Sequence, residues 1–269
     1  MMEYYDIGNS KMPSVGLGTW QLTGKECTKA VENAIRIGYK HIDTADAYSN
    51  HNEVGLALRN TPREELFITT KVWRTDIARQ DLISSGKRAL QELGIEYIDL
   101  YLVHWPNKDI PMEETFEGLL FLKKEGLIKE FGVSNFTINH LDKALKITDE
   151  VRVNQVEFHP LFYQKDLLDY CNKNNIRLTA YSPIGRGEAL KHPVIRKIAE
   201  ETGHTPAQVC LSWILSKGIC VIPKSGSDER QLENIESAGI VLEEKHIKQI
   251  DDIRKTHYQR MINPGFGEF

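Results

Sequence analysis

Hydrophobic residues along the chain follow two alternating periods. Short apolar runs, such as those that lead into Asp43, Lys71 and His104, have the length of buried strands. Between these runs, apolar residues recur at the i, i+3, i+4 spacing of amphipathic helices, for example from Cys27 to Ile35. Strands that alternate with helices in this way predict a parallel sheet with helices packed on it.

The number of repeats and the chain length narrow the fold class. Further strands are expected to end at Ser134, near Gln155, at Tyr181 and at Pro223, with a weak one near Glu236–Ala238. At 269 residues, this repetition predicts a single α/β domain, a (β/α)8 TIM barrel over residues 1–269. A doubly wound sheet is the alternative, but the Gly-x-Gly-x-x-Gly turn typical of that fold is missing from the sequence.

Several segments lie outside the repeating units. The Gly8-Asn9-Ser10 turn predicts a small hairpin over Tyr4–Pro13. Extra helices are expected over Pro193–Thr202 and Pro206–Ser216, before the last unit, and over Glu243–Ile253, after it. Residues 257–269 contain Pro264, Gly265 and Gly267 and are predicted to form a flexible tail.

Composition and charge exclude several partners. The formal net charge is −4 and no basic run stands out, so neither nucleic acid nor a membrane surface is expected as a partner. The N-terminus lacks the apolar core of a signal peptide, and no apolar run has membrane-spanning length. The four cysteines form no closely spaced pair, which favours a reduced, cytoplasmic protein.

Chemically useful side chains stand where the predicted strands end. In a barrel of parallel strands, all carboxyl ends open on one face, so Asp43, Tyr48, Lys71 and His104 are expected to meet there. Each also has a simpler interpretation when it is considered alone. Asp43 could cap a helix, Tyr48 could be a loop aromatic, Lys71 a solvated charge and His104 a core histidine.

Longer motifs around these positions are similar to a known family. These motifs resemble those of the aldo-keto reductases, in the same order along the chain and over about Ile7 to Asn234. The family's longer members carry a long C-terminal loop, and in lacking one this sequence is similar to the small microbial members. The motifs are His41–Ala45 with Tyr48, Lys71–Trp73, Leu102–Pro106, Gly132–Phe136, Gln155, Tyr181–Pro183 and Ile222–Ser225.

The resemblance implies that the protein reduces aldehydes and ketones to alcohols. Tyr48 would be the proton donor, Lys71 and Asp43 would tune it, and His104 would orient the substrate. The chemistry is consistent with these roles, because an ammonium group near a phenol is expected to lower the pKa of the phenol from ~10. A carboxylate would keep that ammonium charged when it is buried.

No side chain can donate a hydride, so the reaction needs a cofactor. The resemblance implies a nicotinamide dinucleotide, with Tyr181 stacked on the nicotinamide ring. The other residues expected to contact it are Gly18 and Thr19 near the nicotinamide half, Ser134, Asn135 and Gln155 at the carboxamide, and Ser182, Ile184 and Arg186 at the pyrophosphate.

A second group of residues bears on which dinucleotide is used. Lys224, Ser225 and Arg230, followed by Glu233 and Asn234, are similar in spacing to the family's site for the adenosine phosphate. Cations and hydrogen-bond donors are the groups that a 2′-phosphate requires. The sequence therefore predicts NADPH/NADP+ as the cofactor, although Lys224 and Arg230 could also be solvated charges beside a turn.

The substrate pocket is expected to be apolar. Trp20, Trp73 and Trp105 match pocket positions of the family, with His104 beside them, and suit a small carbonyl compound with an aliphatic or aromatic body. The short tail after the last helix implies a rather open pocket. Small members of the family are often monomers, and we expect the same here.

Two other functions fit parts of the sequence. A metal-dependent barrel hydrolase could use ligands from strand ends, and the candidates are His41, Asp43, His104, Glu157 and His159. A non-enzymatic NADP-binding subunit that senses redox state is also compatible with the resemblance, but such a subunit need not keep all four catalytic residue types.

Overall fold

Eight parallel strands form the central sheet of the computed structural model, which describes residues 3–263 and 265. Each strand is hydrogen-bonded to the next one in chain order. Within the described residues, the strands are β3 (Leu17–Gly18), β4 (His41–Asp43), β5 (Phe67–Val72), β6 (Ile98–Val103), β7 (Ile128–Ser134), β8 (Val151–Glu157), β9 (Arg177–Tyr181) and β10 (Cys220–Val221).

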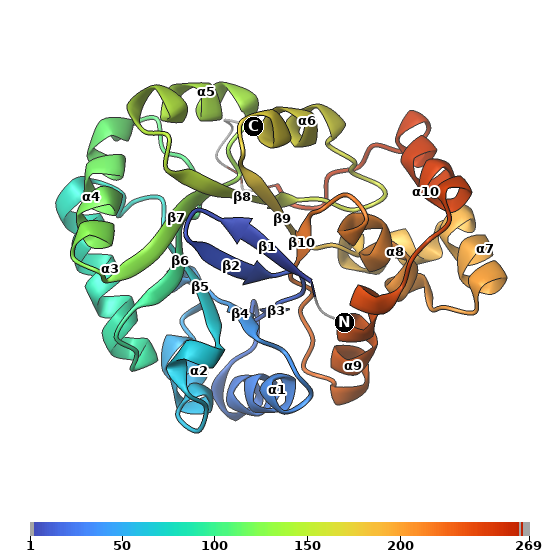
Figure 1. Cartoon of the computed structure of the whole chain (residues 1–269), viewed down its shortest axis with the longest axis horizontal. Helices are drawn as coiled ribbons and strands as arrows, with labels where there is room; N and C mark the ends of the chain where they lie inside the picture. The colour runs from blue at the N-terminus through green and yellow to red at the C-terminus, as the bar shows by residue number, and fades with distance from the viewer. Residues whose placement is uncertain (1–2, 264, 266–269) are drawn as a thin grey trace.

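The first and last strands of this sheet also contact each other. The Gly16 amide donates to the Val221 carbonyl at 2.8 Å, and the Gly18 amide donates to the Pro223 carbonyl at 3.2 Å. Isolated parallel bridges join Val15 to Val221 and Gly18 to Lys224. The ring of strands is therefore joined across its two edges (Figure 1), and the predicted barrel is confirmed.

The prediction of a weak eighth strand near Glu236–Ala238 was wrong. These residues lie at the end of α9 (Asp228–Glu236) and in a 3-10 turn, Ser237–Gly239. The barrel strand that the sequence did not identify is β3, near the start of the chain, and it is only two residues long. Such a short strand carries no alternating pattern, so periodicity could not identify it.

Helices surround the ring of strands (Figure 1). The extra helices predicted before the last strand are confirmed as α7 and α8, and none of the described helices is long and apolar enough to cross a membrane. Besides α9, the helices are α1 (Gly24–Arg36), α2 (His51–Leu58), α3 (Arg79–Leu93), α4 (Met112–Lys124), α5 (Ile138–Ile147), α6 (Lys165–Lys173), α7 (Pro193–Thr202), α8 (Pro206–Leu215) and α10 (Glu244–Asp251).

The predicted hairpin is formed by β1 (Tyr4–Ile7) and β2 (Ser10–Pro13), which pair antiparallel. Figure 1 shows it lying across the centre of the ring of strands. Its buried side chains, including Met12, pack against inward-facing residues such as Phe67 and Leu102. The hairpin therefore fills one end of the barrel, and only the opposite end is available for a site.

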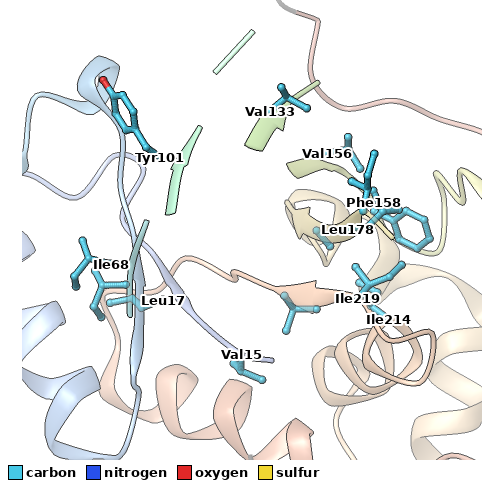
Figure 2. Packing of buried hydrophobic residues seen from close by; sticks show 14 of the residues in the cluster. Val15, Leu17, Ile68, Tyr101, Val133, Val156, Phe158, Leu178, Ile214 and Ile219 are labelled. Carbon is cyan, nitrogen blue, oxygen red and sulfur yellow. The ribbon is translucent and has the colours of Figure 1, made fainter. Parts of the chain in front are cut away.

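Side-chain alternation along β5 explains how Lys71 comes to face the barrel interior. Ile68 and Val72 belong to the large apolar cluster between strands and helices, whereas Phe67 belongs to the cluster inside the barrel. Figure 2 shows labelled residues of this large cluster between strands and helices, including residues of β3 and of β5 to β9, distributed around the ring of strands. Because side chains alternate with period two, Lys71 shares the inward face with Phe67.

The last described residues contact the barrel. The Gln259 amide donates to the Leu161 carbonyl at 2.7 Å. The amides of Met261 and Ile262 donate to the Glu157 carboxylate at 2.5 and 2.9 Å. The rest of the predicted flexible tail, residues 264 and 266–269, lies outside the described residues.

Candidate active site

A cavity of about 760 Å³ opens at the carboxyl ends of the strands. It contains most of the residues that the sequence predicted for a site. The predicted residues that line it are Gly18, Thr19, Trp20, Asp43, Tyr48, Trp73, His104, Trp105, Asn135, Gln155, Tyr181, Ser182, Ile184, Arg186, Lys224, Ser225, Arg230, Glu233 and Asn234. Lys71 and Ser134 do not line the cavity, and both side chains are buried beside it.

Lys71 and Asp43 form a buried ion pair at the base of the cavity. The Lys71 ammonium donates to the Asp43 carboxylate at 2.6 Å and to the Thr44 carbonyl at 2.8 Å. The second carboxylate oxygen of Asp43 accepts from the Gln155 amide at 2.7 Å. Both oxygens of Asp43 are therefore used, which fixes the acid and, through it, the amine.

Tyr48 stands directly above this pair. It follows β4 in a 3-10 turn, Asp46–Tyr48, which ends at Ser49 in the left-handed conformation with φ 52°. The Lys71 nitrogen lies 5.1 Å from the centre of the Tyr48 ring. The rings of Tyr48 and His104 are 5.7 Å apart, edge to face. A phenol, an amine, an acid and an imidazole from separate units thus meet in one small volume.

The expected effect of Lys71 on the pKa of Tyr48 is not what the structure shows. Burial raises the pKa of Tyr48 above its ordinary value of 10.0, and the negative charge of Asp43 raises it further. Asp43 largely offsets the positive charge of its partner, so no net cation faces the phenol. Tyr48 therefore keeps its proton at neutral pH, as a proton donor must.

His104 is held in the neutral form. Burial lowers its pKa well below 6.5, and the positive charge of Lys71 acts in the same direction. Its Nδ1 is buried and has no hydrogen-bond partner among the described residues. Its ring also packs edge to face on Trp73, with centres 5.2 Å apart. A neutral imidazole can donate one hydrogen bond from one ring nitrogen, which suits it to orient a carbonyl oxygen.

Another wall of the cavity is formed by the ends of β7, β8 and β9. Asn135, with φ 63°, donates from its side-chain amide to the His104 carbonyl at 3.0 Å. Its side-chain oxygen accepts from the Tyr181 hydroxyl at 2.8 Å. Ser134 donates to the Gln155 carbonyl at 2.7 Å. The bond to Asn135 fixes the Tyr181 ring in the cavity wall. The Ser134 hydroxyl already donates to a backbone carbonyl of the protein.

Gly18 has a structural reason to be glycine. A Cβ atom there would lie 2.7 Å from the Ile222 carbonyl oxygen, which is backbone and cannot move aside easily. The residue was expected to lie close to a cofactor, and it does line the cavity. The close contact with Ile222 shows that joining the edges of the barrel also requires glycine at this position.

The far end of the cavity is cationic. Lys224 and Arg230 are exposed and line it, and neither forms a salt bridge within the part of the chain that the structure describes. Nearby, the Glu233 carboxylate accepts from the Thr205 hydroxyl. Two cations without acidic partners beside a cavity favour an anionic ligand group.

The five metal ligands considered from the sequence do not form one cluster within the described residues. Glu157 instead accepts from His159 at 2.9 Å and from the two amides of the C-terminal segment. Within the described residues, the one group with potential metal ligands in reach of one another is Asp46, His51 and Glu92, none of which had been proposed. The residues considered for a hydrolase are thus not arranged as one metal site in this part of the chain.

Some cavity residues were not predicted as site residues, although Pro183, Ile222 and Pro223 lie within the motifs identified in the sequence. They are mostly apolar residues from the β9–α7 connection, the start of α8 and the C-terminal segment, and carry no chemical signature: Ala47, Pro183, Gly187, Leu190, Pro206, Ala207, Ile222, Pro223 and Ile262. The short tail was expected to leave the pocket open, yet Ile262 reaches its wall. The capping box of α8, Thr205 with Gln208, was visible in the sequence, but it does not show which way the helix faces.

Comparisons with known proteins show which proteins this chain is similar to. The chain is 42% identical over 253 residues to the 9,11-endoperoxide prostaglandin H2 reductase of Trypanosoma cruzi, covering 91% of this chain and 89% of that protein. It is 41% identical over 249 residues to the glyoxal reductase of Bacillus subtilis, covering 91% of this chain and 90% of that protein. Among solved structures, MGS-M4, an aldo-keto reductase enzyme from a Medee basin deep-sea metagenome library, superposes with a TM-score of 0.91 at 36% identity over 95% of each chain.

Family membership follows from the match to the family as a whole. Residues 14–255, nearly the entire barrel, match the Aldo/keto reductase family. Its members are oxidoreductases of aldehydes and ketones, and they generally use NAD(P)H. The resemblance seen in the motifs is thereby confirmed, and the chain belongs to the aldo/keto reductase family.

Proposed function

We propose that this protein reduces small aldehydes and ketones to alcohols with NADPH, and that Tyr48 donates the proton. The observation that carries the proposal is the arrangement at the base of the cavity. A protonated phenol, Tyr48, lies beside the buried pair of Lys71 and Asp43. His104, neutral and edge to face with Tyr48, is placed to orient a carbonyl oxygen.

The residues that line the cavity support binding of a nicotinamide dinucleotide. It extends from the Tyr48 end, with Tyr181 and Gln155 in its wall, to the cationic end at Lys224 and Arg230. The unpartnered charges at that end would hold the phosphate of NADPH, and the Tyr181 ring would stack on the nicotinamide. When bound, the cofactor supplies the hydride that no side chain can provide.

The side chains then have separate tasks. His104 fixes the carbonyl oxygen of the substrate near the Tyr48 hydroxyl, and Tyr48 gives its proton to that oxygen as negative charge develops on it. The phenolate that remains lies near the Lys71 ammonium, whose charge favours it while the charge of Asp43 opposes it. Asp43, held by Gln155, keeps the ammonium in place throughout.

The size and lining of the pocket favour small substrates. Trp20, Trp73 and Trp105 provide apolar walls near Tyr48, and Ile262 limits the space from the C-terminal side. Because a relative at 41% identity is named glyoxal reductase, we propose short aldehydes, including 2-oxoaldehydes, as the first compounds to test.

The experiment is a cofactor-oxidation assay with purified protein. We expect loss of NADPH absorbance when glyoxal or a short aldehyde is added, with the alcohol as the product. A chelator should leave the rate unchanged, and metal analysis should find no stoichiometric zinc. NADPH binding without turnover across a panel of aldehydes and ketones would favour the redox sensor, and inhibition by the chelator would favour the hydrolase.

A further inference from the structure

A ring of polar contacts outside the cavity ties together the turn that carries Tyr48, helix α3 and strand β5. None of the residues that form this ring was singled out in the sequence. Asp46 precedes Tyr48 by two residues, and His51 follows it by three. Arg88 and Glu92 lie one turn apart on α3, and Thr70 directly precedes Lys71 on β5.

His51 lies at the centre of this ring of polar contacts. Its imidazole side chain is only 3% exposed, and each imidazole nitrogen has a polar partner. Nε2 lies 2.7 Å from the Thr70 hydroxyl, and Nδ1 lies 2.9 Å from the Glu92 carboxylate. A carboxylate only accepts, so Nδ1 carries the hydrogen towards Glu92.

The remaining contacts close the ring on the other side of Tyr48. The Arg88 guanidinium donates to the Asp46 carboxylate at 2.7 Å and lies 4.0 Å from Glu92. Asp46 is 3.9 Å from His51. The Tyr48 turn is thus attached to α3 on both sides, through Asp46 to Arg88 and through His51 to Glu92.

The contact with Thr70 has the most direct consequence for chemistry. Side chains alternate along β5, so Thr70 faces outward to His51 while its neighbour Lys71 faces inward. His51 therefore fixes the position of the Tyr48 turn relative to the strand that carries Lys71. Asn50 holds the turn on its other side, since its amide donates to the Thr19 and Leu22 carbonyls at 3.0 and 2.9 Å.

We propose that His51 is a positioning residue for proton transfer: through Thr70 and Glu92 it sets the distance between the Tyr48 phenol and the Lys71 ammonium. The proposal rests on the proposed function, because it assumes that Tyr48 donates the proton. His51 lies on the outer face of the strands and does not line the active-site cavity, so it acts only through the residues it holds.

The test compares His51→Ala, Thr70→Val and the double variant in a single-turnover assay with NADPH and a short aldehyde. Each single change should lower the rate by roughly tenfold to a hundredfold, as expected for a displacement of about 1 Å. The double variant should be no slower than the slower single one, because both changes break the same contact. The KM for the aldehyde and the Kd for NADPH should stay within about twofold of wild type, since neither residue touches a ligand.

Two readouts separate positioning from a general loss of structure. The solvent isotope effect on the single-turnover rate should increase in His51→Ala, because proton transfer becomes slower. His51→Gln, whose amide can reach the Thr70 hydroxyl, should recover most of the rate. If His51→Ala does not fold, the nearly isosteric Thr70→Val carries the test.

Matched controls make the outcomes distinguishable. His246 is also a buried histidine, 2% exposed, that pairs with a surface carboxylate, Glu201 at 3.2 Å, but it lies on α10. His246→Ala should lower stability and leave the rate unchanged. A wild-type rate in Thr70→Val, or additive losses in the double variant, would overturn the inference. A near wild-type rate in Tyr48→Phe would instead overturn the proposed function on which it rests.

Discussion

Lys71 shows at the level of a single residue how burial and charge define this site. It is among the largest fully buried side chains of the protein, although lysine is seldom buried unless it is paired. Burial lowers the pKa of Lys71 and raises that of Asp43, and their contact at 2.6 Å opposes both changes. Each charge is tolerated in the interior because the other is there.

This dependence can be tested by removing the charges one at a time. Lys71→Met should lower the free energy of unfolding by ~3–5 kcal/mol, because it leaves a buried carboxylate without its cation. The double change Lys71→Met with Asp43→Asn should recover much of that loss, since no charge remains buried. Both variants should be inactive. Denaturant unfolding measures the first effect and aldehyde reduction the second; equal stabilities of the single and double variants would contradict the pairing argument.

Arg230 offers a test of cofactor choice. It is exposed at the cationic end of the cavity, and no acidic partner competes for it among the described residues. Arg230→Ala should raise the KM for NADPH by roughly tenfold or more, the loss of one charge-assisted contact, and leave the KM for NADH nearly unchanged. Steady-state kinetics with both cofactors give the comparison. Equal effects on the two cofactors would show that Arg230 does not recognise the phosphate.

Single residues also show what the sequence could and could not reveal. Asp43 and Lys71 lie at the carboxyl ends of their strands and His104 directly follows one, so barrel topology alone predicted that they converge. The raised pKa of Tyr48 could not be predicted, because it depends on how deeply the hydroxyl is buried and on how far Asp43 offsets Lys71. Ile262 was missed because an apolar residue in a tail gives no chemical signal.

At the level of elements, the barrel depends on a short strand that the sequence hardly indicates. β3 is two residues long, yet it pairs with β4, and its Gly18 is bridged to Lys224, which follows β10. Longer elements were recognised well, because α7 and α8 each contain a full helical period and clear start signals. The prediction failed where an element is defined by its neighbours rather than by its own pattern.

Closure of the barrel at Gly18 can be tested with a one-methyl change. Gly18→Ala should destabilise the protein by ~1–3 kcal/mol, because the new Cβ would lie 2.7 Å from the Ile222 carbonyl oxygen. Gly239→Ala is the control, since no atom lies within 4 Å of the Cβ position there. Thermal unfolding of the two variants provides the measurement. If Gly18→Ala has the same melting temperature as wild type, the two edges of the sheet are less tightly joined than the contacts indicate.

At the level of the whole molecule, the two ends of the barrel have different tasks. The hairpin and the inward-facing apolar residues fill one end, and the cavity occupies the other. His41 lies towards the filled end, two residues before Asp43 on the same inward face, with its ring against Phe67 at 5.0 Å and its Nε2 2.9 Å from the Thr69 hydroxyl. A histidine in such a place stays neutral.

That buried histidine makes the fold sensitive to acid. Burial lowers the pKa of His41 from 6.5 to about 3. Below pH 6.5 His41 becomes protonated in the unfolded chain but stays neutral in the folded protein. The free energy of unfolding therefore falls as the pH drops towards 3. The slope is ~1.4 kcal/mol per pH unit, or ~2 kcal/mol between pH 6.5 and 5.

Denaturant unfolding of wild type and His41→Gln at pH 7 and pH 5 tests this sensitivity. The variant has no group that titrates at this position, so it should lose ~2 kcal/mol less than wild type on acidification. An identical loss in both proteins would mean that His41 is protonated in the folded state as readily as in the unfolded one.

The most direct test of the whole proposal is the single-turnover oxidation of bound NADPH by a short aldehyde, measured for wild type and for Tyr48→Phe, together with the Kd for NADPH of each. We expect the variant to bind NADPH as tightly as wild type and to react ~10²–10⁴-fold more slowly, because it has lost only the proton that Tyr48 supplies. A variant that oxidises NADPH at close to the wild-type rate would contradict the assignment of Tyr48 and, with it, the mechanism proposed for this site.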